Sequence, residues 1–422
     1  TMAIWIWVIG ALLLSRAALG KAKIPFEHYI WMLLPIDMYG VEVGGASIKP
    51  YMVFGAFIIL RNIWSGRNIR IPVLAFLVMV LLVVSDCMNG FILESFMQHV
   101  MFILIVLIAV SYVAALERNV DLDDIKRVTV STTIGFGATF ALAYAMMLVG
   151  LRIGGVFTAD RYAPGIFLSL MDTGGISVTR LRGFYIDPNT VVTTLLPGAC
   201  FSLNGILRGE KNTLRDGSAL LLYTLVVVLS GSRTAMACSA GIFVILLVSA
   251  FRKSGNKALW VIASLFMLTL LVRANVLDKL TGYALKTYTE LATLTSENGR
   301  ITIWVDNALL LLKQNKWLFG VGQNQIQHLT GTGLECHNTW LEWICGAGLV
   351  AGGAAIYWFF SVPGFVFRRA RVTAIKMQTF LPLLFAYFAI CLCITTVDNI
   401  TNSCLIFLAV ICGMGNLKTS AV

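Results

Sequence analysis

The chain has 422 residues, of which 58% are hydrophobic and only 13% are charged. Soluble domains carry roughly a quarter charged residues, so this composition excludes a soluble domain and predicts an integral membrane protein. Much of the net charge of +11 lies in short loops between apolar runs, so it gives no indication of nucleic-acid binding.

Apolar runs recur along the whole chain, and each approaches the ~20 residues that cross a bilayer. Barrel strands would alternate in polarity, so these continuous runs predict an all-α, polytopic membrane bundle of about twelve helices. The predicted spans lie near 2–16, 46–61, 71–86, 95–115, 129–150, 189–206, 217–231, 234–251, 257–273, 338–361, 378–396 and 401–416.

Two stretches near the N-terminus need separate interpretation. Residues 2–19 have no basic start and precede further spans, which favours a first transmembrane helix over a cleavable signal peptide. Residues 24–45 carry Glu27, Asp37 and Glu42 together with prolines. We therefore expect a partly inserted or re-entrant segment there and not a span.

Short basic loops set the expected orientation. They lie at 61–70, 117–127, 207–215, 252–257 and 367–376. All fall on one side of the predicted bundle, which the positive-inside rule assigns to the cytoplasm together with both termini.

The two longest polar stretches, 151–188 and 274–337, fall on the opposite side, where we expect the chemistry. Helical spacing of apolar residues in 276–294 and 300–313 predicts a small helical cap between the ninth and tenth spans. No soluble domain is evident, so residues 1–422 are predicted to form a single polytopic membrane domain.

A metal or cofactor site is not expected. The nine cysteines lie mostly inside or at the ends of apolar segments, without a CxxC pair or zinc-ligand spacing, which is typical of small core residues. The Asp-x-Asp pattern at Asp121 and Asp123 lies on the basic side, across the membrane from His337.

Arg233, in "LSGSRTA", is the most informative charged residue. It lies between two apolar runs, where an unpaired Arg costs about 2.5 to 3.5 kcal/mol at mid-membrane. An anionic ligand would compensate this charge. The alternatives are a side chain that reaches the lipid headgroups or an ion pair with a remote carboxylate such as Asp398.

Arg300 is a second cation on the same side. Guanidinium groups bind phosphate through paired donors and stay charged at physiological pH. Several of them converging on one side predict a phosphate or diphosphate ligand. Alternatively, Arg300 pairs with Glu297.

Arg180 and Arg182 are further candidates for this ligand, although their position also suits lipid-facing side chains. Of the two we favour Arg182, because the following turn would carry it beside Asp187 and Asn189.

His337 is the candidate general base. A reference pKa of ~6.5 allows a neutral imidazole to accept a proton near neutral pH, and Glu335 or Glu342 would orient it. Alternatively, it is a polar cap of the span that begins at Asn338. By contrast, His328 is expected in a solvated loop, and His99, one turn after Glu94, is expected to be a satisfied interior residue.

Five motifs occur in a characteristic order: "RLRGFYIDPNT", "LSGSRTA", "SENGRITIW", "WLFGVGQNQI" and "CHNTWLEWICGAGLVAG". Set among about twelve spans, they resemble the bacterial O-antigen ligase and polymerase superfamily, and most of all O-antigen ligase. The resemblance covers nearly the whole chain, although each motif is short.

This resemblance implies a metal-independent glycosyltransferase of the bacterial inner membrane whose active site faces the periplasm. The donor would be an O-antigen polysaccharide on undecaprenyl diphosphate, and the acceptor a sugar hydroxyl of lipid A-core. The essential arginines and histidine of the family carry over by motif onto Arg233, Arg300 and His337. Arg182, Arg180, Asn189 and Asn338 are the candidate substrate-binding residues, and no cofactor is implied.

Other functions fit parts of the pattern. An O-antigen polymerase uses the same donor, although the His337-Asn338 pair favours the ligase. A transporter or flippase for lipid-linked glycan would favour inverted repeats and charged, broken helices near the midplane, which this sequence does not show. A ligase for another acceptor, such as a protein hydroxyl or amide, also stays open.

Overall fold

A computed structural model describes most of the chain. The described residues are 2–36, 40–43, 46–151, 156–159, 163, 165–171, 177–185, 188–207, 212–231, 300–329, 336, 338–372 and 403–418. The predicted spans at 234–251, 257–273 and 378–396 lie outside these ranges. So does the first predicted cap helix at 276–294.

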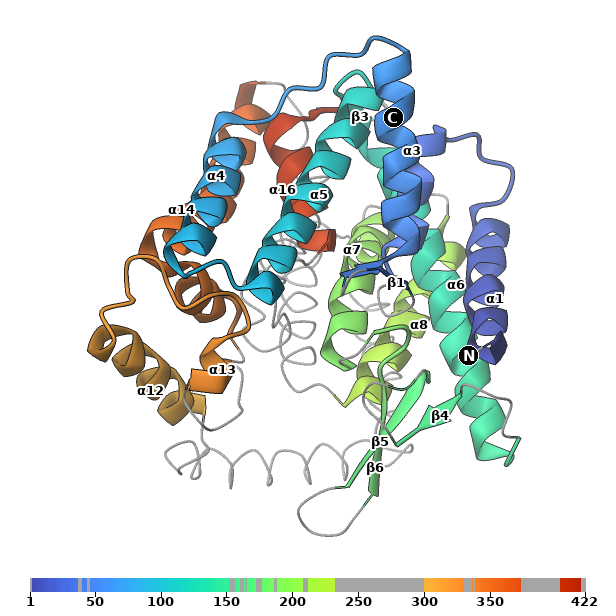
Figure 1. Cartoon of the computed structure of the whole chain (residues 1–422). Helices are drawn as coiled ribbons and strands as arrows, with labels where there is room; N and C mark the ends of the chain where they lie inside the picture. The colour runs from blue at the N-terminus through green and yellow to red at the C-terminus, as the bar shows by residue number, and fades with distance from the viewer. Residues whose placement is uncertain are drawn as a thin grey trace.

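The fold is mostly helical, and each predicted span within the described residues overlaps a helix, although the span at 46–61 begins in a short strand (Figure 1). The long helices are α1 (Met2–Leu19), α3 (Pro50–Trp64), α4 (Val73–Met88), α5 (Leu93–Ala115), α6 (Leu122–Leu148), α7 (Pro188–Leu207), α8 (Thr213–Ser230), α14 (Thr339–Val372) and α16 (Ser403–Met414).

Four of the described helices are long and apolar enough to cross a membrane. They are α5, α6, α8 and the part of α14 from Thr339 to Ser361, while α1, α3, α4 and α7 are apolar but shorter in their described parts. These helices confirm a helical membrane fold. The number of twelve spans stays a prediction.

The 24–45 stretch forms no long helix. It folds into η1 (Phe26–Tyr29) and α2 (Ile30–Leu33), followed by an antiparallel pair of strands, β1 (Val41–Val43) and β2 (Ala46–Ile48). Pro35 lies two residues after the end of α2, and its ring nitrogen has no N–H that could continue the helical hydrogen bonds. Buried Trp31 donates its indole N–H to the Tyr112 hydroxyl of α5 at 3.3 Å, so this segment packs against the bundle.

Part of the 151–188 stretch forms a three-stranded sheet, which the all-α prediction missed. Strand β4 (Phe157–Thr158) runs parallel to β5 (Phe167–Met171), which pairs antiparallel with β6 (Ser177–Leu181). The register places Arg180 opposite Leu168. The sheet lies at the end of the bundle where α6 finishes (Figure 1).

The basic loops meet at the opposite end. Arg67 lies 3.8 Å from the Glu117 carboxylate, and Lys126 lies 3.5 Å from Asp216 at the start of α8. Strand β3 (Asn119–Asp121) pairs there in parallel with β7 (Asn416–Lys418). Figure 1 shows α12 (Arg300–Lys313), α13 (Ile326–Leu329) and the β4–β6 sheet at the other end. In the described part of the chain, the basic loops at 61–70 and 117–127 therefore lie opposite α12 and the sheet, and the orientation in the membrane stays a prediction.

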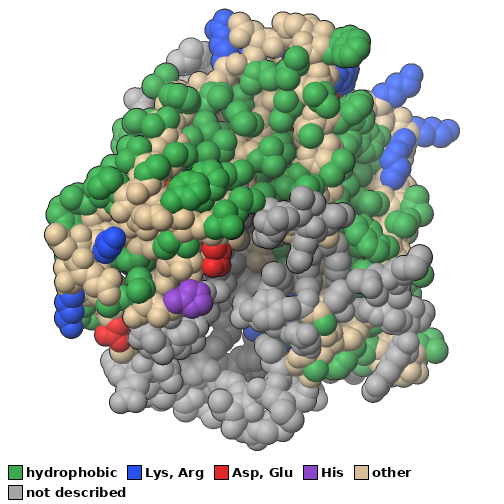
Figure 2. Space-filling view, viewed as in Figure 1, with side chains coloured by type: hydrophobic (Ala, Val, Ile, Leu, Met, Phe, Trp, Pro, Cys, Tyr) green, Lys and Arg blue, Asp and Glu red, His purple; other side chains and the backbone are tan. Residues whose placement is uncertain are grey.

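Aromatic side chains pack between α5 and α14 in the interior of the bundle. The outer surface of the bundle is also apolar. The Phe102 ring meets the Trp343 and Trp358 rings edge-on, with centroids 5.7 and 6.2 Å apart. Large hydrophobic side chains such as Phe57 and Leu60 are exposed, and Figure 2 shows such side chains over a broad band of one face. Extended apolar surface of this kind suits contact with lipid.

Candidate functional site

Helix α12 holds the residue that precedes His337. The Trp304 indole N–H donates to the Cys336 carbonyl oxygen at 2.8 Å, and the Asn307 amide donates to Cys336 Sγ at 3.0 Å. Ile303, Asn307 and Leu311 recur at four-residue intervals and are buried, so one face of α12 is turned inward. The predicted helix at 300–313 is therefore confirmed, with Arg300 as its first residue.

The residue after His337 caps α14. The Asn338 carboxamide oxygen accepts hydrogen bonds from the backbone N–H groups of Trp340 at 3.1 Å and Leu341 at 3.2 Å. These donors have no partner within the helix, which is why Asn is favoured at this position. The cap considered for His337 is thus made by Asn338, while His337 itself lies outside the described residues.

Glu342 of α14 contacts the segment that precedes this helix. Its buried carboxylate accepts the Cys336 backbone N–H at 3.3 Å, from one turn inside α14. The hydrogen bond of the Cys336 thiol to Cys345, the burial of this thiol and the nearby Glu342 carboxylate together raise the pKa of Cys336. Of the two acids proposed to orient His337, Glu342 is placed next to the chain at that point, and Glu335 lies outside the described residues.

Helix α14 is broken at Gly348, and the loop before α13 pairs with the break. Gly348 has φ 75° and ψ 177°, a conformation essentially restricted to glycine. The N–H of Val321 donates to the Cys345 carbonyl at 2.9 Å, and the N–H of Leu349 donates to the Trp317 carbonyl at 2.9 Å. The motifs "WLFGVGQNQI" and "CHNTWLEWICGAGLVAG" therefore form one unit.

Gly348→Ala tests this break. A Cβ at Gly348 would lie 2.1 Å from the Leu318 carbonyl oxygen, whereas one at Gly353 meets nothing within 4 Å. Steric strain and the disallowed backbone should lower the free energy of unfolding by at least about 1–3 kcal/mol. We expect a clearly reduced midpoint of thermal unfolding in detergent for Gly348→Ala and little change for Gly353→Ala. Equal unfolding midpoints for the two variants would show that the backbone at position 348 does not require glycine.

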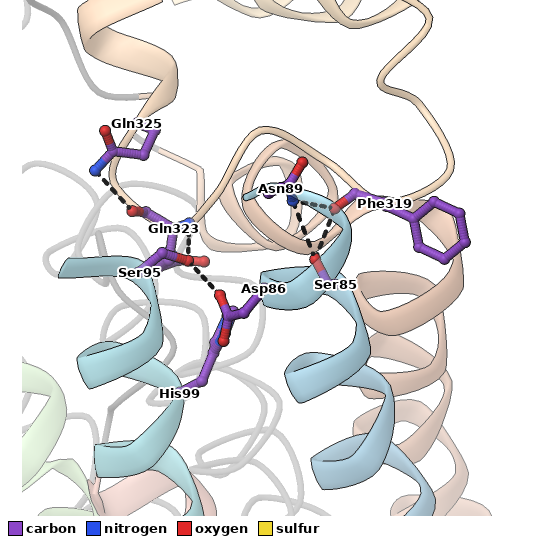
Figure 3. A network of polar contacts seen from close by, with 8 residues as sticks. All are labelled: Ser85, Asp86, Asn89, Ser95, His99, Phe319, Gln323 and Gln325. Atoms are coloured by element: carbon purple, nitrogen blue, oxygen red, sulfur yellow. Dashed lines mark hydrogen bonds and ion pairs between the residues drawn. The ribbon is translucent and has the colours of Figure 1, made fainter. Parts of the chain in front are cut away.

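Helices α4 and α5 anchor the 317–323 loop (Figure 3). The Phe319 carbonyl accepts hydrogen bonds from Ser85 Oγ at 2.6 Å and from the Asn89 amide at 2.8 Å. The backbone N–H of Gln323 donates to Ser95 Oγ at 2.8 Å. The loop is therefore fastened at both ends to the core of the bundle.

Asp86 is the centre of this anchor. Its carboxylate accepts a hydrogen bond from Ser95 Oγ at 2.7 Å and contacts His99 Nδ1 at 2.6 Å, with all three side chains buried (Figure 3). His99 is thus the interior residue that we expected. Its partner is Asp86 from α4, whereas the neighbouring Glu94 accepts a hydrogen bond from Gln325 at 3.2 Å.

Asp86→Ala should destabilise the fold strongly, because it leaves His99 and Ser95 buried without their acceptor. A buried polar group that loses its hydrogen-bond partner costs about 1–3 kcal/mol, and here two groups lose theirs. The matched control is Glu94→Ala, since its hydrogen bond is exposed and worth under about 1 kcal/mol. Denaturant unfolding in detergent would measure both, and a small loss for Asp86→Ala would show that the anchor contributes little.

Arg180 and Arg182 bind main-chain carbonyls. Arg180 Nε donates to the Ser230 carbonyl at 2.7 Å, at the C-terminal end of α8 and three residues before Arg233 in the chain. Arg182 is fully buried and donates to the carbonyls of Gly165 and Ala163. The Arg180 contact joins the sheet to α8, whereas the Arg182 contacts hold Ala163 and Gly165 beside β6. A role for either guanidinium in ligand binding stays a prediction.

The remaining candidates are placed only in part. Asn189 lies in the first turn of α7, while Asp187 and Arg233 lie outside the described residues. His328 is exposed on α13, as expected. Within the described ranges, no three His, Cys, Asp or Glu side chains are grouped so that they could hold a metal ion.

A comparison with known protein families finds a match in this part of the chain. Residues 218–356 match the family model described as O-antigen ligase. The match covers about a third of the chain and supports membership in the O-antigen ligase and polymerase superfamily. The matched region contains Arg233, Arg300 and His337, and it runs from α8 through α12 and α13 to residue 356, beyond the break in α14. A search of the curated proteins gave no match.

The family match supports a ligase or polymerase activity of the glycosyltransferase type, acting on lipid-linked glycan in general. Together with the apolar helices, it indicates a multi-pass membrane protein.

Proposed function

We propose that this protein is an O-antigen ligase. In this proposal it transfers O-antigen polysaccharide from undecaprenyl diphosphate to a sugar hydroxyl of lipid A-core, at the periplasmic face of the bacterial inner membrane. The family match, the described apolar helices and the polar end opposite the basic loops support this function.

The observation that carries the proposal is the contact of α12 with the chain next to His337. Trp304 and Asn307 bind Cys336, whose carbonyl carbon is bonded to the His337 nitrogen. Arg300 begins the same helix and precedes Trp304 by four residues, or about 6 Å of helical rise. We therefore propose that the base His337 and the cation Arg300 serve one site.

A second cation would come from the neighbouring motif. Arg180 contacts the end of α8, from which the chain continues to Arg233. In the proposed reaction, the neutral His337 imidazole removes the proton from the acceptor hydroxyl as its oxygen attacks the anomeric carbon. The bond from that carbon to the diphosphate oxygen breaks, and Arg233 and Arg300 stabilise the departing negative charge. One such displacement inverts the anomeric centre.

The test is transfer by the purified protein in detergent, with polyprenyl-diphosphate glycan and lipid A-core in the presence of a chelator. We expect glycan on lipid A-core, and we expect it to be absent with Arg233→Ala. Loss of transfer on chelation, restored by one added divalent metal, would contradict a metal-independent site.

The product distinguishes the related functions. A polymerase would lengthen the polyprenyl-linked glycan and leave lipid A-core unmodified. A transporter would form no new glycosidic bond and would move the intact donor across proteoliposome membranes. Either result would replace the ligase assignment.

A further inference from the structure

Two thiols touch next to the proposed base. Cys336 Sγ lies 3.7 Å from Cys345 Sγ, and both residues are fully buried in a small cluster with Leu311, Val321 and Ile326. The contact joins the chain just before His337 to the second turn of α14.

We infer that Cys336 and Cys345 form a disulfide in the protein as it exists in its membrane. This inference rests on the proposed function, because that function places the pair on the periplasmic side, where disulfides form and persist. The two sulfur atoms are already in contact. Closing 3.7 Å to a bond of about 2.05 Å requires side-chain rotation and a small approach of the two Cβ atoms.

The oxidant is a disulfide-carrying protein of the periplasm. A thiolate of the pair attacks the carrier disulfide and forms a mixed disulfide, which the second thiolate resolves. The two thiols lose two protons and two electrons, and the carrier disulfide becomes a dithiol. This exchange takes place while the segment emerges from the membrane, because the folded protein buries both sulfur atoms.

Such a bond would close a loop of ten residues that contains His337. Cys336 is already bound through its carbonyl to Trp304 and through its N–H to Glu342. A disulfide adds a covalent connection to the part of α14 that precedes Gly348. Cys336, the residue before His337 in the chain, is then held against both helices.

The decisive measurement is peptide mapping of the full-length protein. Cells are quenched in acid, the protein is denatured and alkylated, and it is digested without reductant for mass spectrometry. We expect a peptide that links residues 336 and 345, and we expect it to separate on reduction. Cys200 and Cys404, which are buried in helices, serve as internal controls and should carry the alkyl group. If Cys336 and Cys345 are alkylated as fully as these controls, the inference is wrong.

Two further preparations sharpen the test. With Cys345→Ser the linked peptide should disappear and Cys336 should become alkylated. In cells without periplasmic dithiol oxidase activity the linked fraction should fall several-fold, and an unchanged fraction would overturn the exchange route. Transfer is measured on protein purified without reductant from a parallel portion of the same cells, and it separates the two proposals. Transfer by a fully reduced protein refutes the disulfide alone, and a linked protein that transfers nothing refutes the ligase alone.

Discussion

His337→Ala is expected to lower the rate of glycan transfer about 100- to 10,000-fold, the range that general base catalysis contributes. Without the imidazole, the acceptor hydroxyl must lose its proton to water as it attacks the anomeric carbon. The donor diphosphate is held by other residues in the proposed site, so its binding should change little. Single-turnover transfer at saturating donor measures the chemical step, and binding of radiolabelled donor is measured separately.

The matched control is His328→Ala. His328 is exposed on α13, nine residues earlier in the chain than His337. The His328→Ala variant should therefore transfer glycan at the rate of the unmodified protein. If His337→Ala retains more than about a tenth of the rate, the role of general base belongs to another group.

Arg300→Ala is expected to lower kcat about 100- to 1,000-fold, comparable to removal of one donor that stabilises transition-state charge. The guanidinium is proposed to stabilise the charge that grows on the diphosphate oxygen as the sugar departs. Arg300→Lys should recover only part of the rate, because an ammonium keeps the charge but lacks the paired donors. Steady-state transfer at varied donor concentration separates kcat from KM.

Lys313→Ala is the control for Arg300, since it removes a cation from the other end of the same helix, where the side chain is exposed. It should leave kcat and KM unchanged. An Arg300→Ala variant that raises KM at constant kcat would show that the guanidinium binds the donor equally in the ground and transition states.

The sequence predicted the long helices and α12 well, because both depend on local patterns. Continuous apolar runs mark helices that face lipid, and the 3.6-residue period marks the half-buried α12. The predicted range 300–313 coincides with Arg300–Lys313. The described part of the 24–45 stretch contains no long helix, which agrees with the expectation that it is not a span, while its partial insertion stays a prediction.

The features missed from the sequence depend on contacts between distant residues. The β4–β6 strands are too short for a clear alternating pattern. Asp86 and His99 are thirteen residues apart on different helices, so the nearer Glu94 was the visible candidate as a partner. The contact between Cys336 and Cys345 was equally hidden, because it crosses from a loop to a helix without a recognised motif.

The candidate site was predicted from the family motifs more than from the charge and the position of its residues. Asn338 was placed at the start of α14, and its side chain does cap that helix. Arg182 was favoured for a ligand by its neighbours in the chain, whereas its described contacts are to main-chain carbonyls of the sheet region. The roles of Arg233, Arg300 and His337 stay predictions for the experiments above.

The break at Gly348 divides α14 into two mechanical parts. The part before it accepts hydrogen bonds from the backbone N–H groups of Val321 and Gly322, and the part after it donates to the carbonyls of Trp317 and Leu318. The 317–322 loop therefore bridges the break. A force on this loop would reach both parts of α14, and through the loop's bonds to Ser85 and Ser95 it would also reach α4 and α5.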